Sequence, residues 1–190
     1  MRGTPKKEDL FKIPNLLCYL RILMVPLFIY LFLTKYYWQS AVVVLLAAGT
    51  DILDGYIARH FNMTTDWGKF IDPVADKMMQ FSMLILTIFK IKWVLILVIC
   101  FTIKELILLV VGIYIYHNDY NLSGSNWAGK LCTVVMDTVL LIFIAFDGIP
   151  EALALVLVGI VIVVLLISFV VYLSQYKKLY DEHIKKKKKA

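Results

Sequence analysis

Four aspartates, Asp51, Asp54, Asp72 and Asp76, lie within 26 residues of a chain that is otherwise rich in apolar side chains. A charged side chain at membrane depth costs at least a few kcal/mol, so such residues usually face a cavity and have partners. Four carboxylates need a strong counter-charge, and oxygen ligands of this kind favour Mg²⁺ or Mn²⁺ over zinc. Two such ions, about 4 Å apart, would clamp a phosphoryl group during a displacement reaction.

The spacing of these aspartates predicts two helix faces. The first face contains residues at i, i+3, i+4 and i+7, namely Asp51, Asp54, Gly55 and Ala58. The second contains residues at i, i+4 and i+8, namely Gly68, Asp72 and Asp76. Two antiparallel helices joined by a polar turn near residues 62–66 would aim the carboxylates at each other. The small residues on both faces would let a bulky ligand approach the backbone closely.

The same residues form a recognisable motif, which reads D, two residues, DG, two residues, AR, eight residues, G, three residues, D, three residues, D. This pattern resembles the signature of the CDP-alcohol phosphotransferase family. Every fixed position is filled at the expected spacing, by Asp51, Asp54, Gly55, Ala58, Arg59, Gly68, Asp72 and Asp76. A purely structural alternative, in which buried polar residues only tie two helices together, does not require this pattern.

The resemblance implies a reaction and a role for each motif residue. The reaction is transfer of a phosphatidyl group from CDP-diacylglycerol to an alcohol, with release of CMP. By this resemblance Asp51, Asp54 and Asp72 bind metal, while Asp76 binds metal and also deprotonates the attacking hydroxyl as a general base. The residues implied for the CDP moiety are Asn15, Gly55, Ala58, Arg59 and Gly68.

The acceptor alcohol is indicated by residues outside the eight-position motif. The segment Pro14–Asn15 with Arg21, and the stretch GKFIDPVADK, resemble phosphatidylglycerophosphate synthases, whose acceptor is glycerol 3-phosphate. Its phosphate needs cations nearby, and the candidates are Arg21, Arg59, Lys104 and Lys130. Two positions depart from the pattern of that subfamily. Lys104–Glu105 stands where that subfamily often has Arg-Glu, and Cys132 replaces the second lysine of GKxKT.

Several other functions remain open from the sequence. Within the family, a cardiolipin synthase would use phosphatidylglycerol as the acceptor, and myo-inositol or serine acceptors fit the motifs less well. From another class, a divalent-cation transporter would also place carboxylates in the membrane, but its acidic groups would be distributed across the bilayer. A two-metal lipid phosphatase would need water in place of the alcohol. We expect no nucleic-acid partner.

Composition places the chain in the membrane. Hydrophobic residues make up 61% of its 190 residues and the mean hydropathy is +0.80, well above the soluble average. We therefore predict an all-α membrane protein with six transmembrane helices, each near the ~20 residues that a bilayer requires. They are expected at about 15–34, 39–60, 68–89, 93–116, 127–146 and 152–174. The three cysteines, Cys18, Cys100 and Cys132, show no metal-binding spacing and are interpreted as buried thiols that fill space.

We predict one transmembrane domain, residues 15–175, with a short segment on either side of it. Residues 1–14 are predicted to form a short amphipathic juxtamembrane helix at the lipid surface. Residues 176–190 are predicted to form a basic cytoplasmic tail, in which Lys185 to Lys189 attract anionic membrane lipid or are simply solvated. Family resemblance further implies a homodimer.

Basic residues predict the orientation in the cell membrane. Six spans bring one set of basic segments to the same side: the N-terminus, the turn after the second span and the C-terminal tail. The opposite loops are less basic, although Lys90 and Lys92 weaken the contrast. The motif is therefore expected to face the cytoplasm in a multi-pass protein.

Two charged positions lie outside the motif, near the predicted bilayer centre. Lys104 and Glu105 on the fourth span are adjacent, hence about 100° apart on a helix, and are not expected to share a partner. We predict that Lys104 pairs with Asp137 of the fifth span, and that Glu105 turns toward the active-site cavity or Arg21.

Overall fold

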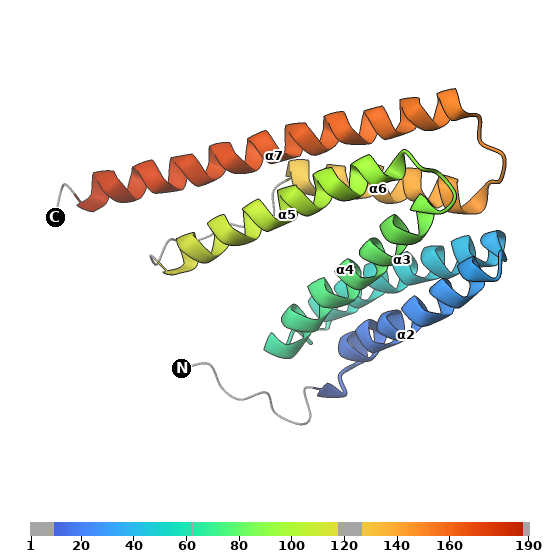
Figure 1. Cartoon of the computed structure of the whole chain (residues 1–190). Helices are drawn as coiled ribbons and strands as arrows, with labels where there is room; N and C mark the ends of the chain where they lie inside the picture. Colours follow the sequence, from blue (N-terminus) through green and yellow to red (C-terminus); the bar gives the residue numbers. More distant parts are fainter. Residues whose placement is uncertain (1–9, 62, 118–126, 188–190) are drawn as a thin grey trace. The chain divides into compact units, whose positions relative to one another are not determined.

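The computed structural model describes residues 10–61, 63–117 and 127–187, and this part of the chain is helical without strands. Its elements are α2 (Ile13–Leu33), α3 (Tyr37–His60), α4 (Asp66–Ile88), α5 (Val94–His117), α6 (Trp127–Ala145) and α7 (Glu151–Lys187) (Figure 1). All predicted helix ends agree within two residues except the last. The all-helical fold class is therefore confirmed over the described ranges.

Five of these helices are long and apolar enough to cross a membrane, by length and composition among the described residues: α2, α3, α5, α6 and the Glu151–Lys177 part of α7. Only 22% to 33% of each apolar window is buried inside the protein, so the remaining apolar side chains are left for lipid. The helix α4 differs because charged residues of the motif interrupt its apolar sequence. The prediction of six spans is thus supported for five helices, and for α4 it stays a prediction.

The helix α7 is longer than predicted. It continues to Lys187, whereas the span was expected to end at residue 174. Beyond Gly159 the sequence contains no glycine or proline that would stop a helix, and its polar residues are good helix formers. Much of the predicted basic tail is therefore helical. The predicted juxtamembrane helix falls mostly on residues 1–9, which lie outside the described residues.

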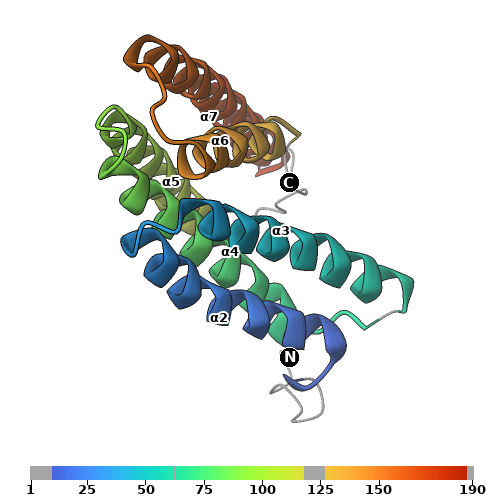
Figure 2. The same ribbon diagram turned by 90° about the vertical axis from the view of Figure 1, so that its right-hand side faces the viewer.

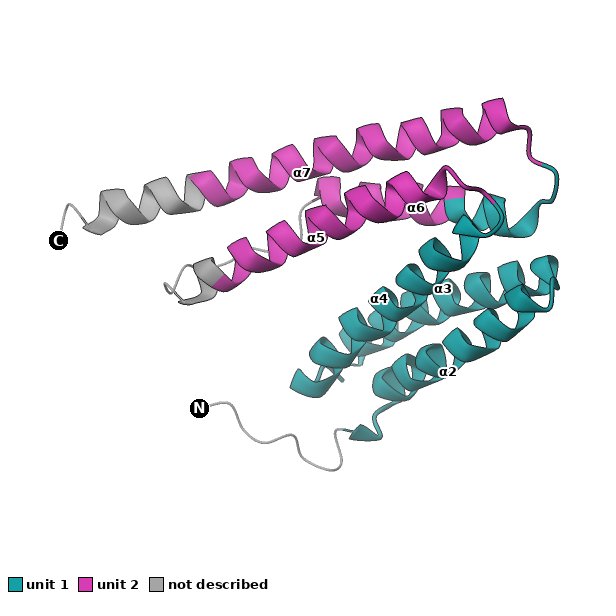
Figure 3. Cartoon of the chain, in the orientation of Figure 1, with its two compact units in different colours: residues 1–90, 140–148 teal, residues 91–139, 149–190 magenta. Residues whose placement is uncertain are grey.

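The chain divides into two compact units (Figure 3). The first unit contains residues 1–90 and 140–148, and in it α2 packs against both α3 and α4 (Figure 2). The face of α2 that is buried carries Cys18, Arg21, Val25, Phe28 and Phe32, which recur every three or four residues as expected for one helical stripe. This stripe is apolar toward Phe32 and polar toward the start of the helix.

A mostly buried cation, Lys90, lies in the first unit just after the C-terminal end of α4. The Nζ of Lys90 lies 2.8 Å from Oδ1 of Asp147 and donates to the carbonyl oxygen of Ile144 at 3.0 Å. It also lies 3.9 Å from the ring centroid of Tyr37. Lys90 is one of the two lysines in a loop that was predicted to lie on the less basic side of the membrane. Its contacts give it a structural role in joining α3, α4 and the 140–148 segment.

The second unit contains residues 91–139 and 149–190, and in it α5 packs against α7. The buried stripe of α7 contains Ala154, Val158, Val161 and Leu165, again at helical spacing. Gly129 of α6 faces Tyr172 of α7 so closely that an added Cβ would lie 2.3 Å from the tyrosine hydroxyl. The glycine of the GKxKT-like segment therefore leaves room for the Tyr172 side chain against α6.

Candidate functional site

The four motif aspartates converge in the first unit, as predicted from their spacing. Two groups of potential metal-ligating side chains are found among the described residues, with ligand atoms within 4.8 Å of one another in each group. One group is Asp51, Asp72 and Asp76, and the other is Cys18, Asp54 and Asp72. Asp72 belongs to both. The donors are mostly carboxylate oxygens, a set that fits hard divalent cations.

The carboxylates differ in their access to solvent. The Asp54 side chain is 6% exposed, whereas those of Asp51, Asp72 and Asp76 are 46%, 42% and 49% exposed. The cluster therefore has one buried carboxylate and three that are about half exposed, which form its open side.

Arg21 of α2 lies among all four carboxylates. Its Nη2 is 3.1 Å from Oδ1 of Asp51 and 2.5 Å from Oδ2 of Asp54. Its Nη1 is 3.1 Å from Oδ1 of Asp72 and also pairs with Asp76. One nitrogen thus contacts the two carboxylates of α3, and the other contacts the two of α4. The site is thus formed by the two expected helices, α3 and α4, together with α2, which supplies the arginine.

Cys18 is the site residue that the sequence interpretation missed. Its thiol donates to Oδ2 of Asp54 at 3.5 Å and to Oδ1 of Asp72 at 3.8 Å, so it does more than fill space. The signal was present in the spacing. Asn15, Cys18 and Arg21 follow one another at intervals of three on α2 and share its buried face.

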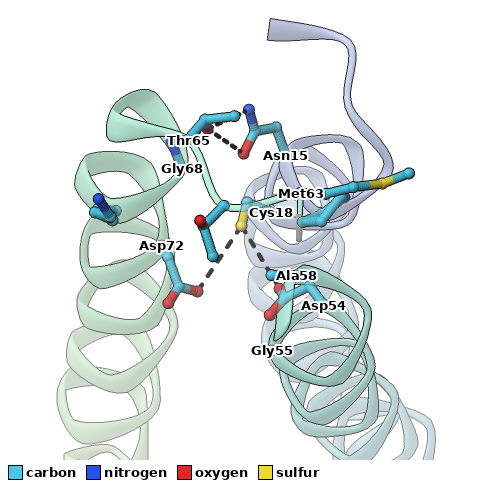
Figure 4. A pocket seen from close by; sticks show the side chains of 12 residues that line it. Asn15, Cys18, Asp54, Gly55, Ala58, Met63, Thr65, Gly68 and Asp72 are labelled. Atoms are coloured by element: carbon cyan, nitrogen blue, oxygen red, sulfur yellow. Dashed lines mark hydrogen bonds between the residues drawn. The ribbon is translucent and has the colours of Figure 1, made fainter. Parts of the chain in front are cut away.

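A cavity of about 130 Å³ lies beside the carboxylates, between α3, α4 and the start of α2 (Figure 4). Its lining includes four of the predicted CDP-binding residues, Asn15, Gly55, Ala58 and Gly68, together with Cys18, Asp54 and Asp72. Arg59, the fifth predicted residue, is exposed on α3 and is not part of the lining. It lies next to Gly55 instead, since an added Cβ there would be 3.6 Å from Nη2 of Arg59.

One end of this cavity is built by a side-chain network at the start of α4. Asn15 donates through Nδ2 to Oγ1 of Thr65 at 3.1 Å, and this hydroxyl accepts from the backbone N–H of Gly68 at 2.8 Å. Thr65 thereby caps the helix. A Cβ on Gly68 would lie 2.5 Å from Oδ1 of Asn15. Glycine is therefore required at position 68 because the Asn15 side chain approaches its backbone closely, and not only because a ligand could do so.

The predicted acceptor-phosphate residues fall in different places. Arg21 is engaged by the carboxylates, and Arg59 is exposed on α3. Lys104 and Lys130 lie on α5 and α6 in the second unit. Their role in acceptor binding stays a prediction.

The two adjacent charged residues of α5 contact each other. The Nζ of Lys104 lies 3.4 Å from Oε1 of its neighbour Glu105, because long side chains can bridge the angular separation of adjacent helical positions. The same ammonium lies 6.0 Å from the ring centroid of Tyr172. The expected pairing of Lys104 with Asp137 stays a prediction.

Comparison with known proteins adds independent findings. Residues 11–172 match the family model described as CDP-alcohol phosphatidyltransferase. A CDP-diacylglycerol–glycerol-3-phosphate 3-phosphatidyltransferase of Aquifex aeolicus is 33% identical over 177 residues, which cover 90% of this chain and 99% of that protein. The enzyme of the same name from Pseudomonas fluorescens is 47% identical over 79 residues, 40% of each chain.

A third relative carries a different name. The cardiolipin synthase (CMP-forming)/mitochondrial hydrolase fusion protein of Schizosaccharomyces pombe is 44% identical over 73 residues, 38% of this chain. The match spans 12% of that fusion protein. This chain therefore spans well under two thirds of the Pseudomonas and Schizosaccharomyces relatives, and nearly all of the Aquifex one.

Proposed function

Because the chain belongs to the CDP-alcohol phosphatidyltransferase family, we propose that it transfers the phosphatidyl group of CDP-diacylglycerol to glycerol 3-phosphate. The products are phosphatidylglycerophosphate and CMP. The observation that carries this proposal is the convergence of the motif aspartates from α3 and α4 beside one cavity. The name of the Aquifex relative, which aligns over nearly its whole length, supports the acceptor.

The proposed reaction is a displacement at the phosphorus atom that carries the diacylglycerol. A P–O bond forms with the acceptor oxygen, and the bond to the departing CMP breaks. Asp76 accepts the hydroxyl proton as general base. Two divalent cations, Mg²⁺ or Mn²⁺, would be held by Asp51, Asp54, Asp72 and Asp76, where bound ions stabilise the charge on the phosphoryl oxygens.

The cavity is proposed to receive the CDP moiety. Gly55 and Ala58 present little side chain on the α3 side, and Gly68 does so on α4, so a flat base and its sugar can approach the helices closely. Asn15 supplies an amide at the far end. Arg59 is proposed to contact the diphosphate from the rim, which is consistent with its position beside Gly55.

Acceptor binding is proposed to use cations that recognise the phosphate of glycerol 3-phosphate. The candidates remain Arg21, Arg59, Lys104 and Lys130. The replacement of a GKxKT lysine by Cys132 removes one cation from this set. The second candidate function is therefore cardiolipin synthesis with phosphatidylglycerol as the acceptor, and the match to the Schizosaccharomyces fusion protein favours it as the alternative.

One experiment separates these acceptors. The purified protein is incubated with CDP-diacylglycerol and Mn²⁺ or Mg²⁺, and separately with glycerol 3-phosphate, phosphatidylglycerol, inositol or serine. Lipid products are identified by mass spectrometry, and a reaction with EDTA serves as the control. We expect phosphatidylglycerophosphate with glycerol 3-phosphate. Cardiolipin formed with phosphatidylglycerol alone would replace the first candidate by the second. Divalent-ion flux into liposomes without any lipid product would favour a transporter.

The placement in the membrane is proposed from charge. We infer that α4 also crosses the membrane, which brings the number of spans to six. We further infer that the motif faces the cytoplasm of a multi-pass cell-membrane protein, because the turn after α3 and the C-terminal region are both basic. The protein is further proposed to act as a homodimer. Single cysteines introduced at Met63 and Lys185 should be labelled from the same side of the membrane by an impermeant thiol reagent. Labelling from opposite sides would contradict this topology.

A further inference from the structure

Arg21 has a position that the eight-residue motif does not explain. Its side chain is 2% exposed and is one of the largest fully buried side chains among the described residues. Its guanidinium divides its contacts by helix: Nη2 binds Asp51 and Asp54 of α3, and Nη1 binds Asp72 and Asp76 of α4. The planar guanidinium of Arg21 on α2 therefore bridges the carboxylate pair of α3 and the carboxylate pair of α4.

We propose that Arg21 is a positioning residue of the metal centre, which holds the α3 and α4 carboxylates together before metal binds and competes with divalent cations for them. The inference rests on the proposed function, because it takes the four aspartates to be the metal ligands. It differs from the expected role of Arg21 in binding the acceptor phosphate. In this structure both terminal nitrogens are already engaged by carboxylates.

Charge explains why the arginine is needed. Without a cation, four carboxylates within a few ångströms repel each other, and the repulsion is strongest at the buried Asp54, which is poorly screened by water. One guanidinium balances only one of the four charges. It thus reduces the repulsion enough for the helices to pack while leaving a strongly anionic cluster that still attracts divalent cations.

Charge also explains the competition. A guanidinium stays protonated at all accessible pH values, so Arg21 cannot relieve its repulsion from an incoming cation by losing a proton. A divalent ion bound by Asp51, Asp72 and Asp76 would draw on carboxylates that the arginine now contacts. The guanidinium must therefore withdraw from at least part of the cluster when metal binds.

The hydrogen bonding of Arg21 makes such a withdrawal feasible. Its Nε is buried and has no hydrogen-bond partner among the described residues. A buried donor without a partner is a cost to the state that contains it. Among the described residues, the guanidinium is consequently held by its two terminal nitrogens. A competing cation therefore displaces a side chain whose hydrogen-bonding capacity is only partly used.

The test measures metal binding in the absence of nucleotide and lipid substrates. The full-length wild type, Arg21→Met and Arg21→Lys are purified in lipid nanodiscs. The Mn²⁺ affinity is measured by the electron paramagnetic resonance signal of free Mn²⁺, and the thermal unfolding midpoint is measured in EDTA and in Mn²⁺. We expect Arg21→Met to bind Mn²⁺ about tenfold more tightly than the wild type, since a charge-assisted contact no longer opposes binding. Its midpoint should be lower in EDTA and should rise more with Mn²⁺.

Lys90→Met is the matched control. Lys90 is also a mostly buried cation paired with an aspartate in the same unit. It lies far from the carboxylate cluster, because it follows the end of α4, and the part of α4 after Asp76 is about 18 Å long at the rise of an α-helix. This variant should lower the midpoint in both conditions and leave the Mn²⁺ affinity unchanged. It separates a general loss of stability from an effect on the metal centre.

The possible outcomes are distinguishable. Wild-type or weaker Mn²⁺ affinity in Arg21→Met would overturn the competition while leaving the metal centre intact. If no protein binds Mn²⁺ or Mg²⁺ at all, the proposed function itself fails. Should Arg21→Met not fold, Arg21→Lys decides the question, because its single ammonium cannot fork between both carboxylate pairs. Tighter Mn²⁺ binding in that variant supports the proposal, and unchanged binding overturns it.

Discussion

Replacement of Asp76 by asparagine is expected to lower kcat for CMP release by about 10³-fold or more, because it removes both a proposed metal ligand and the proposed general base. Asp76 is half exposed at the open side of the cluster, where the acceptor hydroxyl can reach it. The measurement is CMP release from CDP-diacylglycerol with saturating glycerol 3-phosphate and Mn²⁺. Because the change affects chemistry more than nucleotide binding, the KM for CDP-diacylglycerol should change much less than kcat.

Asp66→Asn provides the matched control for this variant. Asp66 lies on the same helix, is 84% exposed and pairs only weakly with Lys69 across a solvent-exposed 3.0 Å contact. Such surface pairs contribute at most about 1 kcal/mol, so the same chemical change there should leave kcat nearly unaltered. Near-normal turnover of purified Asp76→Asn would show that the general base lies elsewhere.

The second large effect is expected for Gly68→Ala. The added methyl group would lie 2.5 Å from Oδ1 of Asn15 and 3.0 Å from Oγ1 of Thr65, so the amide must move away from its position at the end of the cavity. Overpacking of this kind typically costs about 1–3 kcal/mol, and each 1.4 kcal/mol corresponds to a factor of about ten in an equilibrium constant. We therefore expect kcat/KM for CDP-diacylglycerol to fall by about 10- to 100-fold, mainly through KM.

Gly49→Ala tests whether this effect is local. Gly49 lies in α3, two residues before the motif begins, and no side-chain or distant backbone atom lies within 4 Å of its added Cβ. Alanine is the better helix former, so this variant should keep its activity and its thermal stability. If Gly68→Ala had the same kinetic constants as Gly49→Ala, the contact between Asn15 and Gly68 would have no role in nucleotide binding.

Much of the fold follows from local sequence because helix formation in a membrane depends on nearby residues. A run of about 20 apolar residues must satisfy its backbone hydrogen bonds internally, which is why the predicted ends of α2, α3, α5 and α6 agree with the structure. The end of α7 was placed too early because the loss of hydrophobicity after residue 174 marks where a span ends, whereas the helix itself continues to Lys187.

The composition of the carboxylate cluster was likewise determined by local spacing. Asp51 and Asp54 share a face of α3, and Asp72 and Asp76 share a face of α4, because helical periodicity depends only on residue number. The family resemblance added a predicted chemistry for these four residues, and the match over residues 11–172 confirms the family. The aspartate spacing and the motif did not include Cys18, which lies more than 30 residues before the first aspartate; its one signal was the three-residue spacing with Asn15 and Arg21 on α2.

Only the tertiary structure decided which partners these residues have. The contact of Arg21 with all four aspartates requires α2 to pack against both α3 and α4, and the contact of Asn15 with Thr65 joins residues 50 positions apart. Contacts of this kind depend on the rotation and depth of each helix, which are set by the sum of many packing interactions. The sequence by itself therefore determined the four carboxylates and the helices that carry them, while the packing of α2 determined the cation and the thiol placed among them.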